Sequence, residues 1–204
     1  MARIVDRDAK RLKILEAAAA RFALSGYDAT SMDDLAVAAG VSKGSLYNYF
    51  ENKEDLFYGV FEWFQQLLIR ASMERMREEA GARARFAAFA DASISAFMEH
   101  ATLYPVTLEV WAAAAKTGTR DRFSRALQNL YVAYRAQVGM LLAAAQQSGE
   151  IRGDIDTAAV AAMVIGAVDG LLLQYWLDPS IEPRQWAKSF IDALFNGITT
   201  SKGT

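Results

Sequence analysis

The fold of this chain is decided by the stretch Thr30-Ser31-Met32-Asp33-Asp34-Leu35-Ala36-Val37-Ala38-Ala39-Gly40-Val41-Ser42-Lys43-Gly44-Ser45-Leu46-Tyr47-Asn48-Tyr49-Phe50, which Glu51-Asn52-Lys53 closes. Ser31 and Ser42 are good N-cap residues, and Asp34 stands three residues after Ser31, as in a capping box. Gly40 lies between the two caps and permits a tight turn. The stretch therefore predicts two short helices joined by a glycine turn, a helix-turn-helix.

The second of these helices has the side chains expected of a DNA-reading helix. Such a helix must expose polar side chains at its start while apolar residues behind them fix it to the preceding helix. The predicted inner face consists of Leu35, Ala36, Ala39, Val41, Leu46 and Phe50. A hairpin that merely packs is the alternative, but it has no need of an exposed Ser-Lys-Gly-Ser start.

The outward-facing side chains suit both bases and phosphates. Lys43 can donate to guanine or to a phosphate, Asn48 has the donor and acceptor pair that suits adenine, and Gly44 admits the backbone close to DNA. Free amides at a helix N-terminus also favour a phosphate. The predicted DNA-contacting residues are Thr30, Ser31, Lys43, Gly44, Ser45, Tyr47, Asn48, Tyr49 and Lys53.

Apolar residues recur at helical spacing along almost the whole chain, and no alternating β pattern is present. With three prolines among 204 residues, the sequence predicts an all-α fold of about nine helices. The expected helices cover residues 8–25, 31–40, 42–49, 52–79, 83–101, 104–116, 120–148, 157–177 and 183–197.

The N-terminal arm is basic although the whole chain has a net charge of −2. Phosphate contacts are made mainly by Lys and Arg, so the distribution of charge matters more than its sum. From residue 1 to residue 13, five basic residues face two acidic ones: Arg3, Arg7, Lys10, Arg11 and Lys13 against Asp6 and Asp8. A solvated, frayed terminus is the alternative explanation for this charge.

The segment from Ile14 to Phe57 carries a family resemblance. Its motifs are Phe22-Ala23-Leu24-Ser25-Gly26-Tyr27, Thr30-Ser31, Gly40-Val41-Ser42-Lys43-Gly44-Ser45-Leu46-Tyr47, Tyr49-Phe50 and Asn52-Lys53-Glu54-Asp55-Leu56. In these motifs the chain resembles the TetR family of transcriptional regulators. Asp33 stands where some members place a basic base-reading residue, and Tyr49 stands where others have His.

The resemblance implies an N-terminal three-helix DNA-binding domain over residues 1–53 and a helical ligand-binding and dimerisation domain over residues 54–204. It also implies a homodimer that binds a palindromic operator on double-stranded DNA, usually as a repressor. A small-molecule effector would then control the binding.

Aromatic and Met residues concentrate between about Phe86 and Tyr134, with further ones in the neighbouring helices, as expected for a cavity that holds an apolar or aromatic effector. Packing alone also produces such stripes, so each residue is a candidate for the core as well. The predicted ligand-contacting residues are Trp63, Phe97, His100, Tyr104, Trp111, Tyr131, Tyr134, Met163 and Trp176. Glu99, Glu109 and Asp169 are acidic residues that could orient a ligand.

The last two helices resemble the family's dimer interface. The first contains the small-residue stripe Gly166-Ala167-Val168-Asp169-Gly170, and the second places Trp186, Phe190, Leu194 and Ile198 at helical spacing. An intrachain core is the alternative. Residues 157–177 are almost wholly apolar and have about the length of a membrane span, but Asp169 lies inside them and no basic flank follows, so a buried helix is expected.

Catalytic, metal and cofactor chemistry is not expected. The chain has no Cys, which also fits a reducing cytoplasm, and it has no nucleophile elbow or zinc motif. His100 is the single histidine, and Ala96 and Tyr104 stand at its i±4 positions, so a local helical metal pair is excluded. No signal peptide is apparent at the N-terminus.

These observations predict a cytoplasmic, ligand-responsive DNA-binding transcriptional regulator, a repressor that an effector releases from its operator. One alternative is a helical small-molecule carrier or enzyme whose N-terminal hairpin is only structural. Another is an activator on the same fold.

Overall fold

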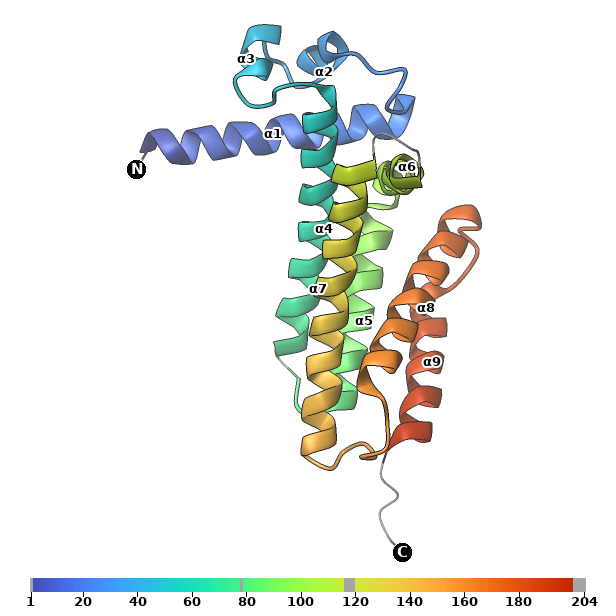
Figure 1. Ribbon diagram of the computed structural model, residues 1–204. Helices are drawn as coiled ribbons and strands as arrows, with labels where there is room; N and C mark the ends of the chain where they lie inside the picture. The colour runs from blue at the N-terminus through green and yellow to red at the C-terminus, as the bar shows by residue number, and fades with distance from the viewer. Residues whose placement is uncertain (1, 78, 116–119, 200–204) are drawn as a thin grey trace, which may run out of the picture. The chain divides into compact units, whose positions relative to one another are not determined.

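The computed structural model describes residues 2–77, 79–115 and 120–199, and Figure 1 shows their helices. Within these ranges the chain forms nine α-helices, one short 3-10 helix and no strand beyond an isolated bridge between Ile151 and Thr199. The helices are α1 (Ala2–Ser25), α2 (Met32–Ala38), α3 (Lys43–Tyr47), α4 (Lys53–Arg77), α5 (Ala82–Glu99), η1 (Ala101–Leu103), α6 (Tyr104–Ala115), α7 (Arg120–Gln147), α8 (Thr157–Leu177) and α9 (Pro183–Ile198). The prediction of an all-α fold with nine helices is confirmed.

The structure has the N-cap residues Ser31 and Ser42 at the helix starts that the sequence predicts. The Ser31 hydroxyl accepts a hydrogen bond from the Asp34 amide at 3.1 Å, and the Asp34 carboxylate accepts one from the Ser31 amide at 2.9 Å. The Ser42 hydroxyl caps α3 through the Ser45 amide. Gly40 adopts a φ of +64° in the turn before α3, which a residue with a Cβ rarely adopts.

Most helix boundaries lie within two residues of the prediction, but the start of α1 does not. Helix α1 begins at Ala2, six residues earlier than expected, because no Gly or Pro interrupts the helix-forming residues that precede Asp8. Helix α3 ends at Tyr47 and leaves Tyr49 outside the helix. The reading helix is thus only five residues long, and its position depends on packing rather than on its own propensity.

The chain divides into two compact units. Unit 1 consists of Met1–Leu67 and His100–Leu127, and unit 2 consists of Leu68–Glu99 and Gln128–Thr204. Helices α4 and α7 therefore each contribute residues to both units.

Unit 1 has an apolar core around α1. The predicted stripe of α1, formed by Ile14, Leu15, Ala18 and Phe22, is buried. The core residues from the other helices include Leu35, Leu46, Phe50, Phe57 and Phe61. Since burying such a side chain stabilises a fold by about 1.5–3 kcal/mol, this core holds the two short helices in place.

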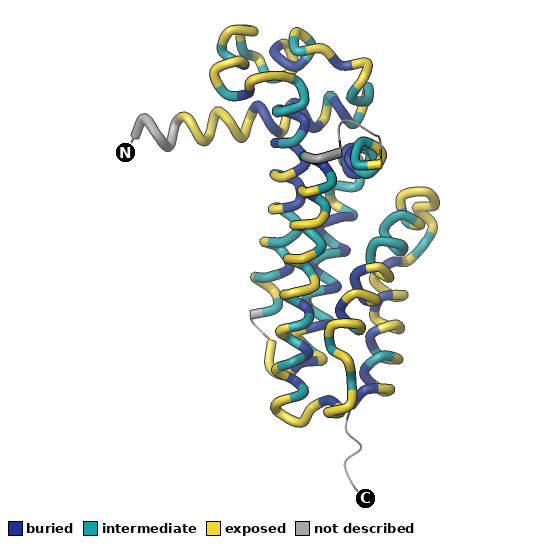
Figure 2. Tube along the Cα trace, viewed as in Figure 1, coloured by how far each residue is buried: buried dark blue, intermediate teal, exposed yellow. Residues whose placement is uncertain are grey.

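Unit 2 has its core where α5, α8 and α9 meet. Phe86 of α5 and Phe195 of α9 pack edge to face with ring centroids 5.5 Å apart. Val138 and Leu142 of α7 join the same buried cluster. Figure 2 shows that many residues of α8 and α9 stay exposed on the side away from this core.

Candidate nucleic-acid interface

Helix α3 presents polar side chains from a buried anchor. Leu46 is completely buried, whereas Lys43, Gly44, Tyr47 and Asn48 are exposed. Ser45 is half-buried, and its amide is held by the Ser42 hydroxyl. These five residues, Lys43, Gly44, Ser45, Tyr47 and Asn48, are called the reading surface below. The structure brings them together as a reading helix requires.

Lys43 forms an ion pair with an acidic residue of α2. Its ammonium Nζ lies 3.0 Å from the carboxylate of Asp33, the second residue of α2. This hydrogen bond, together with the charge of Asp33, raises the pKa of Lys43. A phosphate or base that binds Lys43 must therefore compete with Asp33 for the ammonium.

Other predicted contacts are engaged in the turn between α1 and α2. Thr30 is buried, and its hydroxyl donates to the Gly26 carbonyl at 2.7 Å. Lys53 Nζ donates to the Tyr27 carbonyl at 2.8 Å and lies 4.3 Å from the centroid of the Tyr27 ring. The Ser31 side chain is exposed but belongs to the cap of α2.

Glu109 of α6 holds this turn from its other side. Its two carboxylate oxygens each lie 3.0 Å from the Tyr27 amide, which donates to them. The neighbouring Gly26 has a φ of +78°, and a Cβ there would lie 3.1 Å from the same carboxylate. The Tyr27 ring packs against Phe57 of α4 at 4.9 Å between centroids. The peptide of Tyr27 is thus held at its amide by α6 and at its carbonyl by α4.

An ion pair joins α7 to α4 in the same unit. Arg122 donates to the Asp55 carboxylate at 2.7 Å, and its guanidinium lies 4.1 Å from the centroid of the Tyr58 ring. Asp55 is also bound to Asn52, the N-cap of α4, through its amide at 2.8 Å. Neither the Arg122–Asp55 ion pair nor the Glu109–Tyr27 hydrogen bond is predicted from the sequence, because 67 and 82 residues separate the partners. No local pattern reports such distant pairs.

The predicted ligand-contacting residues are divided between the units. Tyr104 is buried in unit 1, and Trp63, His100 and Trp111 are half-buried there. In unit 2, Phe97 is buried and its ring centroid lies 6.5 Å from that of Tyr175.

Unit 2 also contains a polar cluster on an otherwise apolar helix. Asp169 is the single charged residue of α8, and its carboxylate accepts a hydrogen bond from the Tyr131 hydroxyl at 2.8 Å. Burial raises the pKa of Asp169 and opposes the effect of that hydrogen bond. Burial and the charge of Asp169 raise the pKa of Tyr134. Tyr131 and Tyr134, two of the predicted ligand contacts, thus lie beside Asp169, which the sequence indicates as a possible ligand-orienting residue.

Met163 and Trp176 lie on the outside of α8. They belong to a set of exposed apolar side chains on α8 and α9, called the apolar face below: Met163, Trp176, Leu177, Trp186 and Phe190. Among the described residues, α8 is the one helix whose length and composition would suit a membrane span, and 22% of its most apolar stretch is buried. The expectation that α8 is a buried helix is therefore wrong for its outer side.

Two family models match the chain. The model of "Bacterial regulatory proteins, tetR family" matches residues 14–60, which contain α2, α3 and the C-terminal half of α1. The model of "BetI-type transcriptional repressor, C-terminal" matches residues 82–199, more than half of the chain. The chain belongs to the TetR family of bacterial regulatory proteins. The predicted family, regulatory function and helical ligand-binding body are confirmed, and the family is not an enzyme class.

Individual relatives match this TetR-family regulator along nearly its full length. It is 25% identical over 190 residues to the fatty acid metabolism regulator protein of Bacillus subtilis, covering 93% of this chain and 95% of the relative. It is 26% identical to the HTH-type transcriptional repressor KstR2 of Rhodococcus jostii, covering 95% and 93%. A crystal structure of the regulator FadR from Bacillus subtilis in complex with stearoyl-CoA superposes with a TM-score of 0.77 at 26% identity, covering 92% and 98%.

Proposed function

We propose that this regulator is a homodimeric cytoplasmic repressor that binds a palindromic operator and is released by a small effector with a long apolar part. The reading surface carries the proposal, because a five-residue helix fixed by buried Leu46 has no structural need for exposed Lys43, Tyr47 and Asn48. An activator on the same fold would have the same surface.

We assign base contacts to Lys43, Ser45, Tyr47 and Asn48, with Gly44 allowing close approach. Tyr49 and Ser31 are proposed phosphate contacts at the two sides of α3. Thr30 and Lys53 contribute to DNA binding through the turn that they hold, since their polar groups are bound to the carbonyls of Gly26 and Tyr27. Lys53 would have to leave its carbonyl to reach a phosphate.

The apolar face is proposed to be covered by a second copy of this chain. Gly166 and Ala167 are exposed on α8 with open space around Gly166, so a second helix can approach closely. Asp169 within the helix disfavours lipid as the covering phase. A two-fold dimer also supplies the two reading surfaces that a palindromic operator requires.

The effector is proposed to be an acyl thioester or a compound of similar apolar length. Support comes from the relative that was crystallised with stearoyl-CoA and from the aromatic residues of this chain. Candidate contacts are Phe97, Tyr131 and Tyr134 in unit 2, and Trp63, His100, Tyr104 and Trp111 in unit 1. No role for a metal or another cofactor is proposed. Met163 and Trp176 are better suited to the apolar face than to the effector.

Effector binding is proposed to act on DNA binding through α4, α6 and α7. Helix α4 begins at Lys53, which holds the Tyr27 carbonyl, and α6 supplies Glu109, which holds the Tyr27 amide. A shift of these helices changes the support of α2 and α3 and the separation of the two reading surfaces. Because linkage is reciprocal, operator DNA must weaken effector binding by the same factor.

The test is operator binding with a duplex that the wild-type protein selects from a randomised library, compared with a scrambled duplex. Tyr47→Ala and Lys43→Ala should lose most of the preference for the selected duplex. Palmitoyl-CoA should release the wild-type protein, whereas coenzyme A alone should not. The assignment of α3 is wrong if both variants bind like wild type, and the effector class is wrong if palmitoyl-CoA has no effect. A reporter assay with the gene deleted separates repression from activation.

A further inference from the structure

Helix α1 carries a group of cations that the reading surface does not include. Arg7, Lys10, Arg11 and Lys13 are all exposed, and Asp8 is the single acidic residue between positions 7 and 13. These four cationic side chains are together called the basic face below, and Lys10 and Lys13 lie on a different side of the helix from Arg7 and Arg11. The sequence alone left open whether this charge belongs to a frayed terminus, but here it lies on a continuous helix.

Two of these cations continue the packed stripe of α1. At 100° per residue, Arg7 and Arg11 lie on the same side of the helix as Ile14, Ala18 and Phe22. The latter three are buried against the rest of unit 1. The stripe thus changes from apolar to cationic towards the N-terminus while keeping its direction. On that side the two guanidinium groups lie beside aromatic rings of unit 1.

Arg7 and Arg11 lie just beyond the C-terminal end of α3. Their guanidinium carbons are 5.8 Å from the centroid of the Tyr49 ring and 5.1 Å from that of Phe50, respectively. Tyr49 and Phe50 follow Asn48, the C-cap of α3. A guanidinium that stacks on a ring keeps its N–H edge available for a phosphate.

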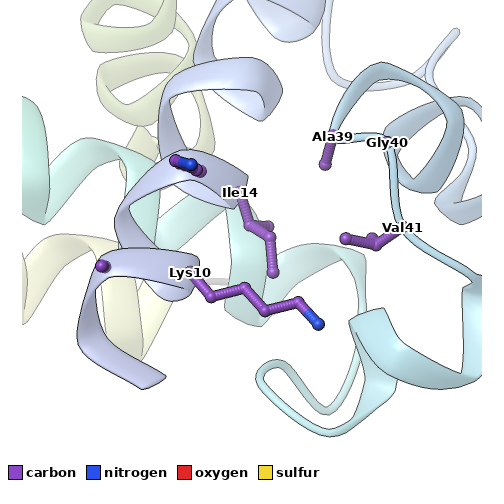
Figure 3. Close-up of a pocket in the computed structure, with 7 residues that line it drawn as sticks. Lys10, Ile14, Ala39, Gly40 and Val41 are labelled. Atoms are coloured by element: carbon purple, nitrogen blue, oxygen red, sulfur yellow. The ribbon is translucent and has the colours of Figure 1, made fainter. Parts of the chain in front are cut away.

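Lys10 and Lys13 lie beside the other end of α3. With Ala39, Gly40 and Val41 they line a pocket of about 380 Å³, and Figure 3 shows the extended Lys10 side chain running past Ile14. Gly40 and Val41 form the turn that leads into Ser42 and α3. The basic face therefore lies beside the chain at both ends of the reading helix.

We propose that the basic face binds the sugar-phosphate backbone of the DNA that α3 reads. A helix in the major groove has a phosphate strand on each side, and the groove is about 12 Å wide, within reach of long Lys and Arg side chains. Such contacts add affinity and fix the register of α3 but carry no sequence information. This inference rests on the proposed function, because it assumes that α3 enters a groove.

The experiment compares two charge-removing double variants, Lys10→Gln/Lys13→Gln and Arg7→Gln/Arg11→Gln. Their control is Arg135→Gln/Lys188→Gln, which removes two exposed cations from unit 2. Affinities for the selected and the scrambled duplex are measured between about 50 and 300 mM salt, where each phosphate contact contributes about 0.9 to the slope of log K against log salt. Circular dichroism and thermal unfolding check that each variant folds.

Each basic-face variant should reduce the slope by up to about 1.8 per protomer and weaken both duplexes by a similar factor, about 10-fold or more. The preference for the selected duplex should remain. Slopes equal to that of the control variant, with both basic-face variants folded, would overturn the proposal. If the wild-type protein itself does not distinguish the two duplexes, the proposed function fails, and this outcome is separate from a failure of the basic face.

Discussion

The reading surface exposes polar side chains and the apolar face exposes apolar ones, although the helices of both surfaces are held by buried apolar residues. On α3 the anchor Leu46 is apolar and the exposed residues are polar. On α9 the anchors Ile191 and Phe195 are apolar, and so are the exposed residues Trp186 and Phe190. An exposed polar surface on a rigid support is suited to a hydrated, charged partner, whereas an exposed apolar one requires cover. One fold thus presents two surfaces for partners of different chemistry.

The largest effect is expected from placing a charge on the apolar face. Phe190→Glu should separate the proposed dimer and lower operator affinity by more than about 100-fold, because burying an unpaired carboxylate costs several kcal/mol. Sedimentation and operator titration measure the two effects. Lys188→Glu, at an exposed position of the same helix, is the control and should remain dimeric. A dimeric Phe190→Glu variant would show that this face is covered by something else.

A substitution in the reading surface should change the sequence preference for DNA and leave dimer formation unchanged. Tyr47→Ala is expected to weaken the selected duplex by about 10- to 100-fold, since one base-reading contact is worth about 1–3 kcal/mol. Dimer formation and thermal stability should not change, because Tyr47 is exposed and contributes little to the core. Val37→Ala removes an exposed apolar side chain of the preceding helix and serves as the control. Equal loss on the scrambled duplex would assign Tyr47 to phosphates instead.

A smaller effect is expected at the contact between α6 and the turn after α1. Glu109→Gln replaces a charge-assisted acceptor of the Tyr27 amide by a neutral one, a loss of about 1 kcal/mol. Operator affinity should fall about 5-fold, and the Tyr27 amide should exchange with solvent faster. Glu99→Gln, at an exposed end of α5, is the control. Unchanged exchange at Tyr27 in the Glu109 variant would remove α6 from the proposed coupling.

The sequence predicts the DNA-reading region well because its signals are local. The caps Ser31 and Ser42, the turn at Gly40 and the buried positions Leu35 and Leu46 all lie within a few residues of the features they determine. The predicted DNA contacts need more information. The hydrogen bonds of Lys53 to Tyr27 and of Lys43 to Asp33 depend on rotamers that spacing does not define.

Long-range placement accounts for what the sequence does not reveal. Helical periodicity identifies an apolar stripe, but it does not tell whether the stripe faces its own chain or another one. Their spacing predicts one dimer face for Trp186, Phe190, Leu194 and Ile198, yet Ile198 is buried and Leu194 half-buried, whereas Trp186 and Phe190 are exposed. The division follows from the position of α5 against α9, which no pattern within α9 records.

The smallest effect is expected at Asp169, where stability rather than binding should change with pH. Burial raises the pKa of Asp169 above its ordinary value of 3.8, so the folded state holds the proton to a higher pH than the unfolded chain. The carboxyl therefore lowers the free energy of unfolding progressively as the pH rises above about 4 and the unfolded chain ionises first. Asp169→Asn keeps an acceptor for the Tyr131 hydroxyl and removes the charge.

The Asp169→Asn variant should thus be more stable than wild type near neutrality, by about 1 kcal/mol, the lower end of the cost of burying a polar group, and the difference should shrink towards pH 4. Chemical unfolding at a series of pH values measures it. Asp178→Asn gives the opposite control, because hydrogen bonds from Ser180 lower the pKa of exposed Asp178 and its charge supports the fold above that pKa. A stability difference for Asp169→Asn that does not vary with pH would mean that packing, not ionisation, determines the role of Asp169 beside Tyr131 and Tyr134.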